Sequence, residues 1–522
     1  MSEQTSRRYL YFAVFFSGIA SLALEMAASR LLEKVFGTSN LVWAVVIGLI
    51  LIYLAVGYFI GGRWADRSPH FQTLYQIITW AGVAVALVPV IARPILSLAA
   101  DAFDQLQIGL LAGSFTAVFV LLLVPVILMG MISPFAIRLA IQQSTDAGRI
   151  SGKIYAISTL GSFLGTFLPV LLLIPTIGTN HTFLAIAALL VLTGLAGLLI
   201  ACGWKKALVY AWTPLLIIGL WLWGFPGSDK NSQGQVYETE SSYNYIQVIQ
   251  KDGYTFLRLN EGQGVHSMYH ATELNYYGPW EQVLVAPFFN KPPYSLSAVQ
   301  RIAIIGLAAG TSARQATAVY GEVPIDGWEI DSKIVEVGRE YFGMTMPNLT
   351  VYEQDGRWGL EHSPYRYQII SVDAYRPPYI PWHLTTQEFF QVVYDHLADD
   401  GVMVINVGRT NDDRRLIDSL GTTILTVFPT VHVIDVPNTY NSIIFASRQP
   451  TSTDNLYENF MAMRDDKTVN PLLTYSMAVA ISSQSAPPQP SLVFTDDCAP
   501  VEWITNDMIV GYLLRTNLED LQ

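Results

Sequence analysis

Hydrophobic residues are distributed differently in the two halves of the chain. Up to residue 224 they form seven long apolar stretches, each near the ~20 residues that a helix needs to cross ~30 Å of hydrocarbon. After residue 235 they come in short β-branched runs separated by turn residues and helix-length segments. The pattern predicts an α-helical transmembrane bundle of about seven helices, then a small β element and an open α/β domain. The seven stretches are 9–29, 41–61, 74–92, 110–131, 155–177, 182–202 and 206–224.

Shifts in composition indicate the domain boundaries. We expect a multi-pass transmembrane domain over 1–225, a linker and N-terminal β element over 226–300, and the α/β domain over 301–522. The segment 226–240 is polar and rich in Gly and Ser, as linkers are. The β element begins in YNYIQVIQ and continues in YTFLRL after the turn KDG.

Basic residues between the apolar stretches favour a cytoplasmic N-terminus. Alternate connections hold nine Lys and Arg residues on one side and two, Lys34 and Arg93, on the other. Seven crossings then place the large domain outside the cell. If the 110–140 segment folds as two pieces around Pro125 and Pro134, the large domain returns to the cytoplasm. The nine residues are Arg7, Arg8, Arg63, Arg67, Arg138, Arg149, Lys153, Lys205 and Lys206.

Two charged residues interrupt the first apolar stretch, which also argues against a cleavable signal peptide. Glu25 and Arg30 are costly in a membrane unless they are paired, hydrated or close to an interface. One interpretation is a polar site or ligand pathway within the bundle. The other is an interfacial pair, in which Arg30 lies with Glu33 or Lys34 at the membrane edge and Glu25 bonds a neighbouring helix.

The overall composition excludes several functions. Hydrophobic residues make up 51% of the chain, and the formal net charge is −12. Residues 226–522 hold 35 of the 42 acidic residues, which would repel a phosphate backbone, so nucleic acid is not an expected partner. The two cysteines, Cys202 and Cys498, form no CxxC pair and no Cys/His cluster. We therefore expect neither a disulfide framework nor a metal site.

A glycine turn and several acids follow successive predicted strands of the second half. In AVQRIAIIGLAAGTSARQATAVYG, glycines bound a turn between a strand and a helix, where backbone N–H groups point at a ligand. About 20 residues later, acids end the strand VPIDGWEID, a spacing suited to carboxylates that accept the hydroxyls of a ribose. Two more strands end in an acid at the same edge of the sheet, where ligands bind in open parallel sheets. The residues are Gly306, Gly310, Glu329, Asp331, Asp355, Gly356 and Asp373.

These segments resemble a known family. Residues 236–505 are similar to the spermidine synthases, or polyamine aminopropyltransferases, whose Rossmann-like domain has the S-adenosylmethionine-dependent methyltransferase fold. The strings LALEMAASRLLEKVFG, GGRWADR and FTDDCAPVEW resemble recurring segments of membrane-fused spermidine synthase-like proteins. The resemblance implies a multi-pass protein of a bacterial cell membrane with its large domain in the cytoplasm, which differs from the charge count.

The resemblance also implies roles for single residues. Gly306 and Gly310 become the glycine loop, Glu329 the ribose ligand and Asp355 the adenine-side contact. Asp373, in VDAYRPP, matches the acid that takes a proton from the attacking amine, a task that suits a carboxylate. The implied cofactor is S-adenosylmethionine or its decarboxylated form.

Two departures from the family pattern remove acids that would hold cationic amines. Ala309 stands where the synthases have an Asp in the glycine loop, and Arg376 replaces the second Asp of DxxDP. The replacement of a carboxylate by Arg exchanges attraction for repulsion worth on the order of 1–4 kcal/mol at close range, which makes putrescine a doubtful substrate. Either the aromatic segment GVHSMYHATELNYYGPWEQ (264–282) rebuilds the substrate shell, or this segment is only an aromatic hairpin that packs on the domain or the membrane surface. The candidates for substrate binding are His266, Tyr269, His270, Tyr277 and Tyr375.

Three functions follow from these patterns. The first is aminopropyl or related alkyl transfer to an amine by a membrane-anchored enzyme, and the second is a non-catalytic binding or assembly protein that retains the fold. The third is methyl transfer from S-adenosylmethionine, which needs the same nucleoside contacts. The expected partners are the lipid bilayer, a small nucleoside ligand, and a homo-oligomer or membrane-protein assembly.

Overall fold

The computed structural model describes residues 3–36, 40–106, 110–141, 146–223, 232–260, 264–376, 379–410 and 412–515. The chain forms two compact units, Met1–Asn231 and Ser232–Gln522. Residues 224–231, which include the first part of the expected linker 226–240, lie outside the described residues, and the last part of that linker forms a strand, Gln235–Glu240. Each unit has its own hydrophobic core.

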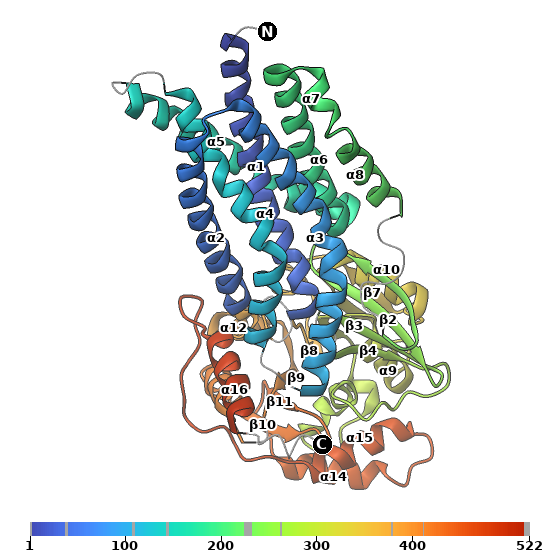
Figure 1. Ribbon diagram of the computed structural model, residues 1–522. Coiled ribbons are helices and arrows are strands. Elements are labelled where there is room, and N and C mark those ends of the chain that lie inside the picture. Colours follow the sequence, from blue (N-terminus) through green and yellow to red (C-terminus); the bar gives the residue numbers. More distant parts are fainter. Residues whose placement is uncertain are drawn as a thin grey trace. The chain divides into compact units, whose positions relative to one another are not determined.

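The first unit consists of long helices that run side by side (Figure 1). Among the residues that the structure describes, six helical segments are long and apolar enough to cross a membrane. One of them, Ala147–Cys202, spans 56 residues and contains two of the predicted stretches, because the helix is kinked at Gly178, where φ is 76°. The expectation of about seven helices therefore agrees with the fold. The elements are α1 (Glu3–Phe36), α2 (Asn40–Arg67), α3 (Phe71–Leu106), α4 (Leu110–Ala140), α5 (Ala147–Leu168), η2 (Pro169–Leu173), α6 (Ile174–Cys202), α7 (Trp204–Leu208) and α8 (Trp212–Trp223).

The fourth apolar stretch is one continuous helix. Pro125 and Pro134 both lie inside α4, which extends from Leu110 to Ala140. The alternative in which this segment folds as two pieces does not occur. The side of the membrane that bears the second unit stays a prediction.

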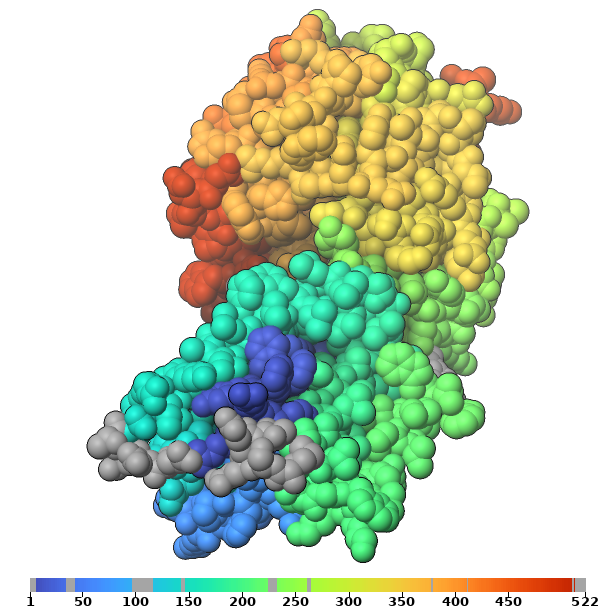
Figure 2. All heavy atoms as spheres, turned by 90° about the horizontal axis from the view of Figure 1, so that it is seen from above, coloured from blue at the N-terminus to red at the C-terminus, as the bar shows by residue number. Residues whose placement is uncertain are grey.

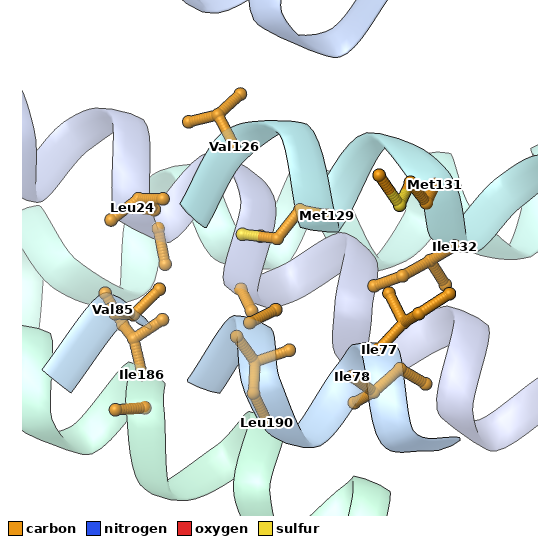
Figure 3. Close-up of a cluster of buried hydrophobic side chains, with 14 of the residues drawn as sticks. Leu24, Ile77, Ile78, Val85, Val126, Met129, Met131, Ile132, Ile186 and Leu190 are labelled. Carbon is orange, nitrogen blue, oxygen red and sulfur yellow. The ribbon is translucent and has the colours of Figure 1, made fainter. Parts of the chain in front are cut away.

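Close packing of small and branched residues holds the helices together. Buried side chains from α1, α3, α4 and α6, among them Leu24, Ile78 and Leu190, meet in one cluster (Figure 3). A Cβ added at Gly165 would collide with the main-chain oxygen of Ile19, so the backbones of α5 and α1 touch there. Seen from above, the dark-blue start of α1 lies among the cyan and green side chains of later helices (Figure 2).

Arg30 of α1 forms an ion pair within the helix. Arg30 Nη1 lies 2.7 Å from Glu33 Oε2, and both side chains are largely buried. Ser29 Oγ donates to the main-chain oxygen of Glu25. An ion pair one turn apart lowers the cost of burying Arg30. The location of the pair relative to a membrane stays a prediction.

The second unit contains a seven-stranded sheet in the order β10-β11-β9-β8-β5-β6-β7. The five strands β9, β8, β5, β6 and β7 are parallel, and β11 pairs antiparallel with both β9 and β10. From β5 the chain winds outward to β6 and β7, then returns to β8 and β9, so the switch point lies between β5 and β8. The strands are β5 (Ile302–Ile305), β6 (Ile325–Trp328), β7 (Leu349–Tyr352), β8 (Tyr367–Val372), β9 (Leu397–Gly408), β10 (Thr430–Asp435) and β11 (Asn441–Ser447).

Helices cover both faces of this sheet, and several begin with the caps that the sequence suggests. The side chains of Asp331, Asp355 and Thr386 accept a main-chain N–H at the starts of α10, α11 and α12. The helical elements are η3 (Trp280–Phe289), η4 (Leu296–Ala298), α9 (Thr311–Tyr320), α10 (Ser332–Tyr341), α11 (Gly356–Glu361), η5 (Trp382–Leu384), α12 (Gln387–His396), α13 (Arg415–Leu425), α14 (Thr453–Met463), α15 (Pro471–Ser482) and α16 (Val501–Arg515).

A four-stranded antiparallel sheet precedes the main sheet, as the sequence predicts. Its strands are β1 (Gln235–Glu240), β2 (Tyr245–Lys251), β3 (Tyr254–Leu259) and β4 (Val265–Tyr269), paired in that order. Apolar residues of β2 and β3 pack against α10 and the turn before α9. Thr311 Oγ1 accepts from Met268 N and donates to Met268 O, both at 2.9 Å. These bonds fix β4 beside the glycine turn.

Candidate functional site at the carboxyl edge of the sheet

The glycine turn that follows β5 lies against the end of β8. Gly306 and Gly310 have φ angles of 82° and 84°, which glycine adopts without strain. A Cβ added at Gly306 would lie 2.5 Å from the main-chain oxygen of Asp373. The main-chain N–H of Asp373 donates to Ile305 O at 2.9 Å. The switch point therefore brings the glycine turn and the end of β8 together.

Glu329 lies directly beside this turn. Its Oε2 accepts from Ala308 N at 2.9 Å, and its Oε1 accepts from Asp331 N at 3.0 Å. The residue is 8% exposed, and this burial raises the pKa of Glu329 to about 7, although the main-chain hydrogen bonds oppose the change. A carboxylate has about four acceptor positions, so these main-chain donors do not use all of them, and a contact with a ribose stays a prediction.

Asp331 and Gly356 have structural contacts in the same region. Asp331 is buried and accepts from Ser241 Oγ at 2.5 Å, Asn244 Nδ2 at 2.9 Å and Lys333 N at 3.1 Å. Asp331 thus ties the β1–β2 turn to the start of α10. A Cβ added at Gly356 would collide with Ile305, so this glycine allows close packing of α11 on β5. A direct role of either residue in cofactor binding stays a prediction.

Asp355 has two hydrogen-bond donors. Its Oδ1 accepts from Trp358 N at 2.9 Å, and its Oδ2 lies 2.9 Å from His383 Nε2. The carboxylate can only accept, so Nε2 carries the proton in this pair. The hydrogen bond from His383 is the largest cause that lowers the pKa of Asp355 below its usual value, and the one from Trp358 N acts in the same direction. Asp355 therefore stays ionised and can accept from the amino group of a nucleobase.

Asp373 has one side-chain donor. Asn406 Nδ2 donates to Asp373 Oδ1 at 2.9 Å, while Asn406 Oδ1 accepts from Asn441 Nδ2 at 2.9 Å. Burial raises the pKa of Asp373 to about 6, and the bond from Asn406 lowers it in part. Parallel strands bring the ends of β8 and β9 together, which explains the contact between residues 33 positions apart. Asn406, Asn441 and His383 were not identified from the sequence, because neither spacing nor a motif marks them.

Tyr375 supports this end of the sheet. Its hydroxyl donates to Asn406 O at 3.0 Å and accepts from Gly408 N at 2.9 Å. Burial raises the pKa of Tyr375 far above its usual value, so the hydroxyl keeps its proton. The side chain therefore fixes the strand that carries Asn406. Contact between Tyr375 and a substrate stays a prediction.

The remaining predicted substrate residues contact the hairpin and the helices around it. The Arg314 guanidinium lies 4.3 Å from the centre of the Tyr269 ring, and His270 Nδ1 accepts from Glu273 N at 3.0 Å. Tyr277 is exposed, and its ring lies 5.6 Å from that of Tyr475 on α15. These contacts are those of a packed aromatic hairpin, and a substrate-binding role stays a prediction.

His266 lies on β4, four residues before His270. Its Nε2 atom is buried and has no hydrogen-bond partner among the described residues. Burial lowers the pKa of His266 to about 4, so the imidazole is neutral at physiological pH. A role of His266 in substrate binding stays a prediction.

Glu281 is a buried acid in the same segment. Its Oε1 accepts from Tyr276 N at 2.7 Å and from Gln315 Nε2 at 2.8 Å, and its Oε2 accepts from Gly278 N at 2.9 Å. Burial is the main cause that raises the pKa of Glu281. Because all three donors belong to the hairpin or α9, Glu281 holds the aromatic hairpin in place.

Comparison with known proteins agrees with this architecture. Residues 291–456 match the spermine/spermidine synthase domain. A probable polyamine aminopropyl transferase of Bifidobacterium longum is 33% identical over 282 residues, which are 51% of this chain and 61% of that protein. A polyamine aminopropyltransferase of Vibrio vulnificus is 27% identical over 39% of this chain and 68% of its own length. The chain thus spans about three fifths of the length of the first relative.

Two solved structures are also similar. Spermidine synthase from Thermotoga maritima shares 20% identity, with a TM-score of 0.39 and coverage of 48% of this chain and 84% of that one. A probable spermidine synthase from Corynebacterium glutamicum shares 19%, with a TM-score of 0.38 and coverage of 50% and 98%.

The strand order and the acidic carboxyl edge define a domain of the methyltransferase type. Within that class, the matched domain and the curated relatives show that the second unit is similar to the spermidine synthases. The resemblance stated from the sequence is therefore confirmed.

Proposed function

We propose that the protein is a membrane-anchored transferase that moves an aminopropyl group from decarboxylated S-adenosylmethionine to an amine. The observation that carries this proposal is Asp373, a carboxylate with a pKa raised to about 6 at the switch point of the sheet, held by Asn406. Six helices long and apolar enough to cross a membrane support the anchoring. A polyamine aminopropyltransferase activity of the relatives is consistent with the reaction.

The nucleoside part of the donor suits the residues around the glycine turn. Glu329 has free acceptor positions for two ribose hydroxyls, and Asp355 has free positions for an adenine amino group. Gly306 leaves no room for a side chain between the turn and Asp373, so the main chain itself forms this wall. When bound, the donor would supply an alkyl carbon activated by a positively charged sulfur.

Asp373 would then act as the general base. The acceptor nitrogen forms a bond to the alkyl carbon, the carbon–sulfur bond breaks and its electron pair stays on sulfur, and the proton of the nitrogen passes to Asp373. A carboxylate whose pKa lies close to the working pH both takes and releases this proton readily. Asn406 keeps Oδ1 in one direction, which leaves Oδ2 for the amine.

The charge around Asp373 favours an acceptor with few positive charges. Arg376 is exposed three residues after Asp373, and Ala309 is buried in the glycine turn. Both positions lack the acids that would hold the second ammonium group of a diamine. We therefore expect a monoamine, or an amine whose far end is neutral or anionic, to react better than putrescine.

The test uses the full-length protein in lipid nanodiscs. Incubation with decarboxylated S-adenosylmethionine and a panel of amines should release methylthioadenosine, which mass spectrometry measures together with the alkylated amine. Asp373→Asn should abolish turnover and leave the affinity for methylthioadenosine within about three-fold, since no nucleoside contact is removed. Equal turnover by Asp373→Asn would refute the base, and a methylated amine formed from S-adenosylmethionine would indicate methyl transfer instead.

A further inference from the structure

The C-terminal segment Phe494–Cys498 packs within the second unit against residues that lie far from it in the sequence. Phe494 is fully buried, its carbonyl accepts from Gln387 N at 2.8 Å, and its N–H donates to Thr423 Oγ1 at 2.9 Å. Two main-chain hydrogen bonds between Thr495 and Cys498 close a tight turn after it. The proposed function gives no role to this segment, although FTDDCAPVEW is one of the strings that carry the family resemblance.

Asp496 at the tip of this turn forms a two-pronged ion pair. Arg357 Nη1 donates to Asp496 Oδ1 at 2.8 Å, and Nη2 donates to Oδ2 at 2.7 Å. Thr386 Oγ1 donates to Oδ1 at 2.7 Å as well. The hydrogen bond from Arg357 is the largest cause that lowers the pKa of Asp496. Such a fork fixes the plane of the guanidinium, which a single contact would not do.

The same guanidinium leads to the nucleoside site. Arg357 Nη1 also donates to the main-chain oxygen of His383 at 2.9 Å. His383 in turn donates through Nε2 to Asp355 Oδ2 at 2.9 Å. Arg357 lies on α11, two residues after Asp355, and His383 lies in the η5 turn. These hydrogen bonds therefore hold α11 and the η5 turn at a fixed separation.

From this arrangement we propose that Asp496 is a positioning residue for recognition of the nucleobase. Asp496 would hold Arg357, Arg357 would hold the His383 main chain, and His383 would keep Asp355 in one orientation. Asp355 would then present its free acceptor positions to the exocyclic amino group of adenine. The inference rests on the proposed nucleoside site and adds that the C-terminal segment forms part of it.

The experiment measures discrimination between two ligands, because a loss of stability alone would weaken both. Calorimetry on the full-length protein in nanodiscs compares methylthioadenosine with 5′-methylthio purine riboside, which lacks the amino group. The wild type should bind methylthioadenosine ~10-fold more tightly, as expected for one hydrogen bond to a charged acceptor. In Asp496→Asn this ratio should fall to about two or less, while the affinity for the purine riboside changes less than three-fold.

A neighbouring acid provides the matched control. Asp497 is exposed and has no hydrogen bond or ion pair to any residue that the structure describes. Asp497→Asn should keep the wild-type ratio. Arg357→Lys, which keeps the charge but loses the fork, should lower the ratio as Asp496→Asn does.

The outcomes separate the two proposals. A wild type that discriminates ~10-fold together with an Asp496→Asn variant that retains this ratio would overturn the positioning role and leave the proposed function intact. A folded wild type that binds neither ligand would overturn both. If Asp497→Asn also lost the preference for methylthioadenosine over the purine riboside, any change in the turn would have the same effect. That outcome would also contradict a specific role of Asp496.

Discussion

The hydrogen bond from Asn406 to Asp373 provides a direct test of the proposed base. Asn406 Nδ2 lies 2.9 Å from Asp373 Oδ1 and opposes the rise of the Asp373 pKa that burial causes. A hydrogen bond favours the charged form of a carboxylate over the protonated form. Removing this donor in Asn406→Ala should therefore raise the pKa of Asp373 further.

The size of the effect follows from the energy of such a bond. If the ionised form loses about 1.4 kcal/mol relative to the protonated form, the pKa rises by about one, from about 6 to about 7. At pH 6 the ionised fraction of Asp373 would fall from about one half to about one tenth, and at pH 8.5 both proteins would be almost fully ionised. The rate of Asn406→Ala relative to wild type should therefore be ~5-fold lower at pH 6 than at pH 8.5.

The assay records release of methylthioadenosine between pH 5.5 and pH 9 at saturating substrate. Titration of the acceptor amine affects both proteins equally, so it cancels in the ratio of their rates. The control is Asn459→Ala, because Asn459 is a fully buried asparagine that donates to Phe288 O and Asn290 O, outside the site. It should lower the rate equally at every pH. A ratio for Asn406→Ala that is independent of pH would contradict the assignment of Asp373 as the titrating base.

Three further predictions concern other parts of the chain. Burial raises the pKa of Glu329 to about 7, and the ionised form is the one proposed to accept the ribose hydroxyls. Calorimetry should therefore show that methylthioadenosine binds about ten-fold more tightly at pH 8 than at pH 6. The variant Glu329→Gln should bind methylthioadenosine weakly at both pH values. Gly165→Leu should destabilise the helical unit by about 1–3 kcal/mol in thermal unfolding in detergent, because a Cβ at this position collides with Ile19 O. The control Gly152→Leu should leave the stability unchanged, since a Cβ there meets nothing within 4 Å. Arg376→Asp should raise turnover with putrescine relative to a monoamine by about ten-fold, and an unchanged preference would remove the charge argument.

Much of the second unit could be predicted from the sequence, because its local patterns agree with its tertiary structure. The strands that precede Gly306, Glu329, Asp355 and Asp373 are short, and a turn or helix start follows each of them. Parallel pairing then requires these ends to meet at one edge. The acids could be located in this way, but the groups that set their protonation could not.

The supporting residues depend on contacts that no local pattern reveals. His383 reaches Asp355 from the η5 turn, and Asn406 reaches Asp373 from the next strand, across 28 and 33 positions of sequence. Asp331 was predicted from its position at a strand end, yet its oxygens accept from Ser241 and Asn244, about 90 residues earlier. The contacts of Asp331 result from the way the β1–β4 sheet packs against α10, which periodicity does not specify.

The protonation of three acids at the same edge assigns them different tasks. Asp355 has donors on both oxygens and a lowered pKa, so it remains an acceptor at any physiological pH and suits recognition rather than proton transfer. Asp373 has one donor and a pKa raised to about 6, so it exists in both protonation states near neutrality. Glu329 has a pKa raised to about 7, and its ionised form is the better acceptor, so under the proposed function nucleoside binding would depend on pH. An acceptor amine that reacts in its neutral form needs only a base with the pKa of Asp373, and it needs no second acid to hold an ammonium group. Arg376 is then compatible with catalysis.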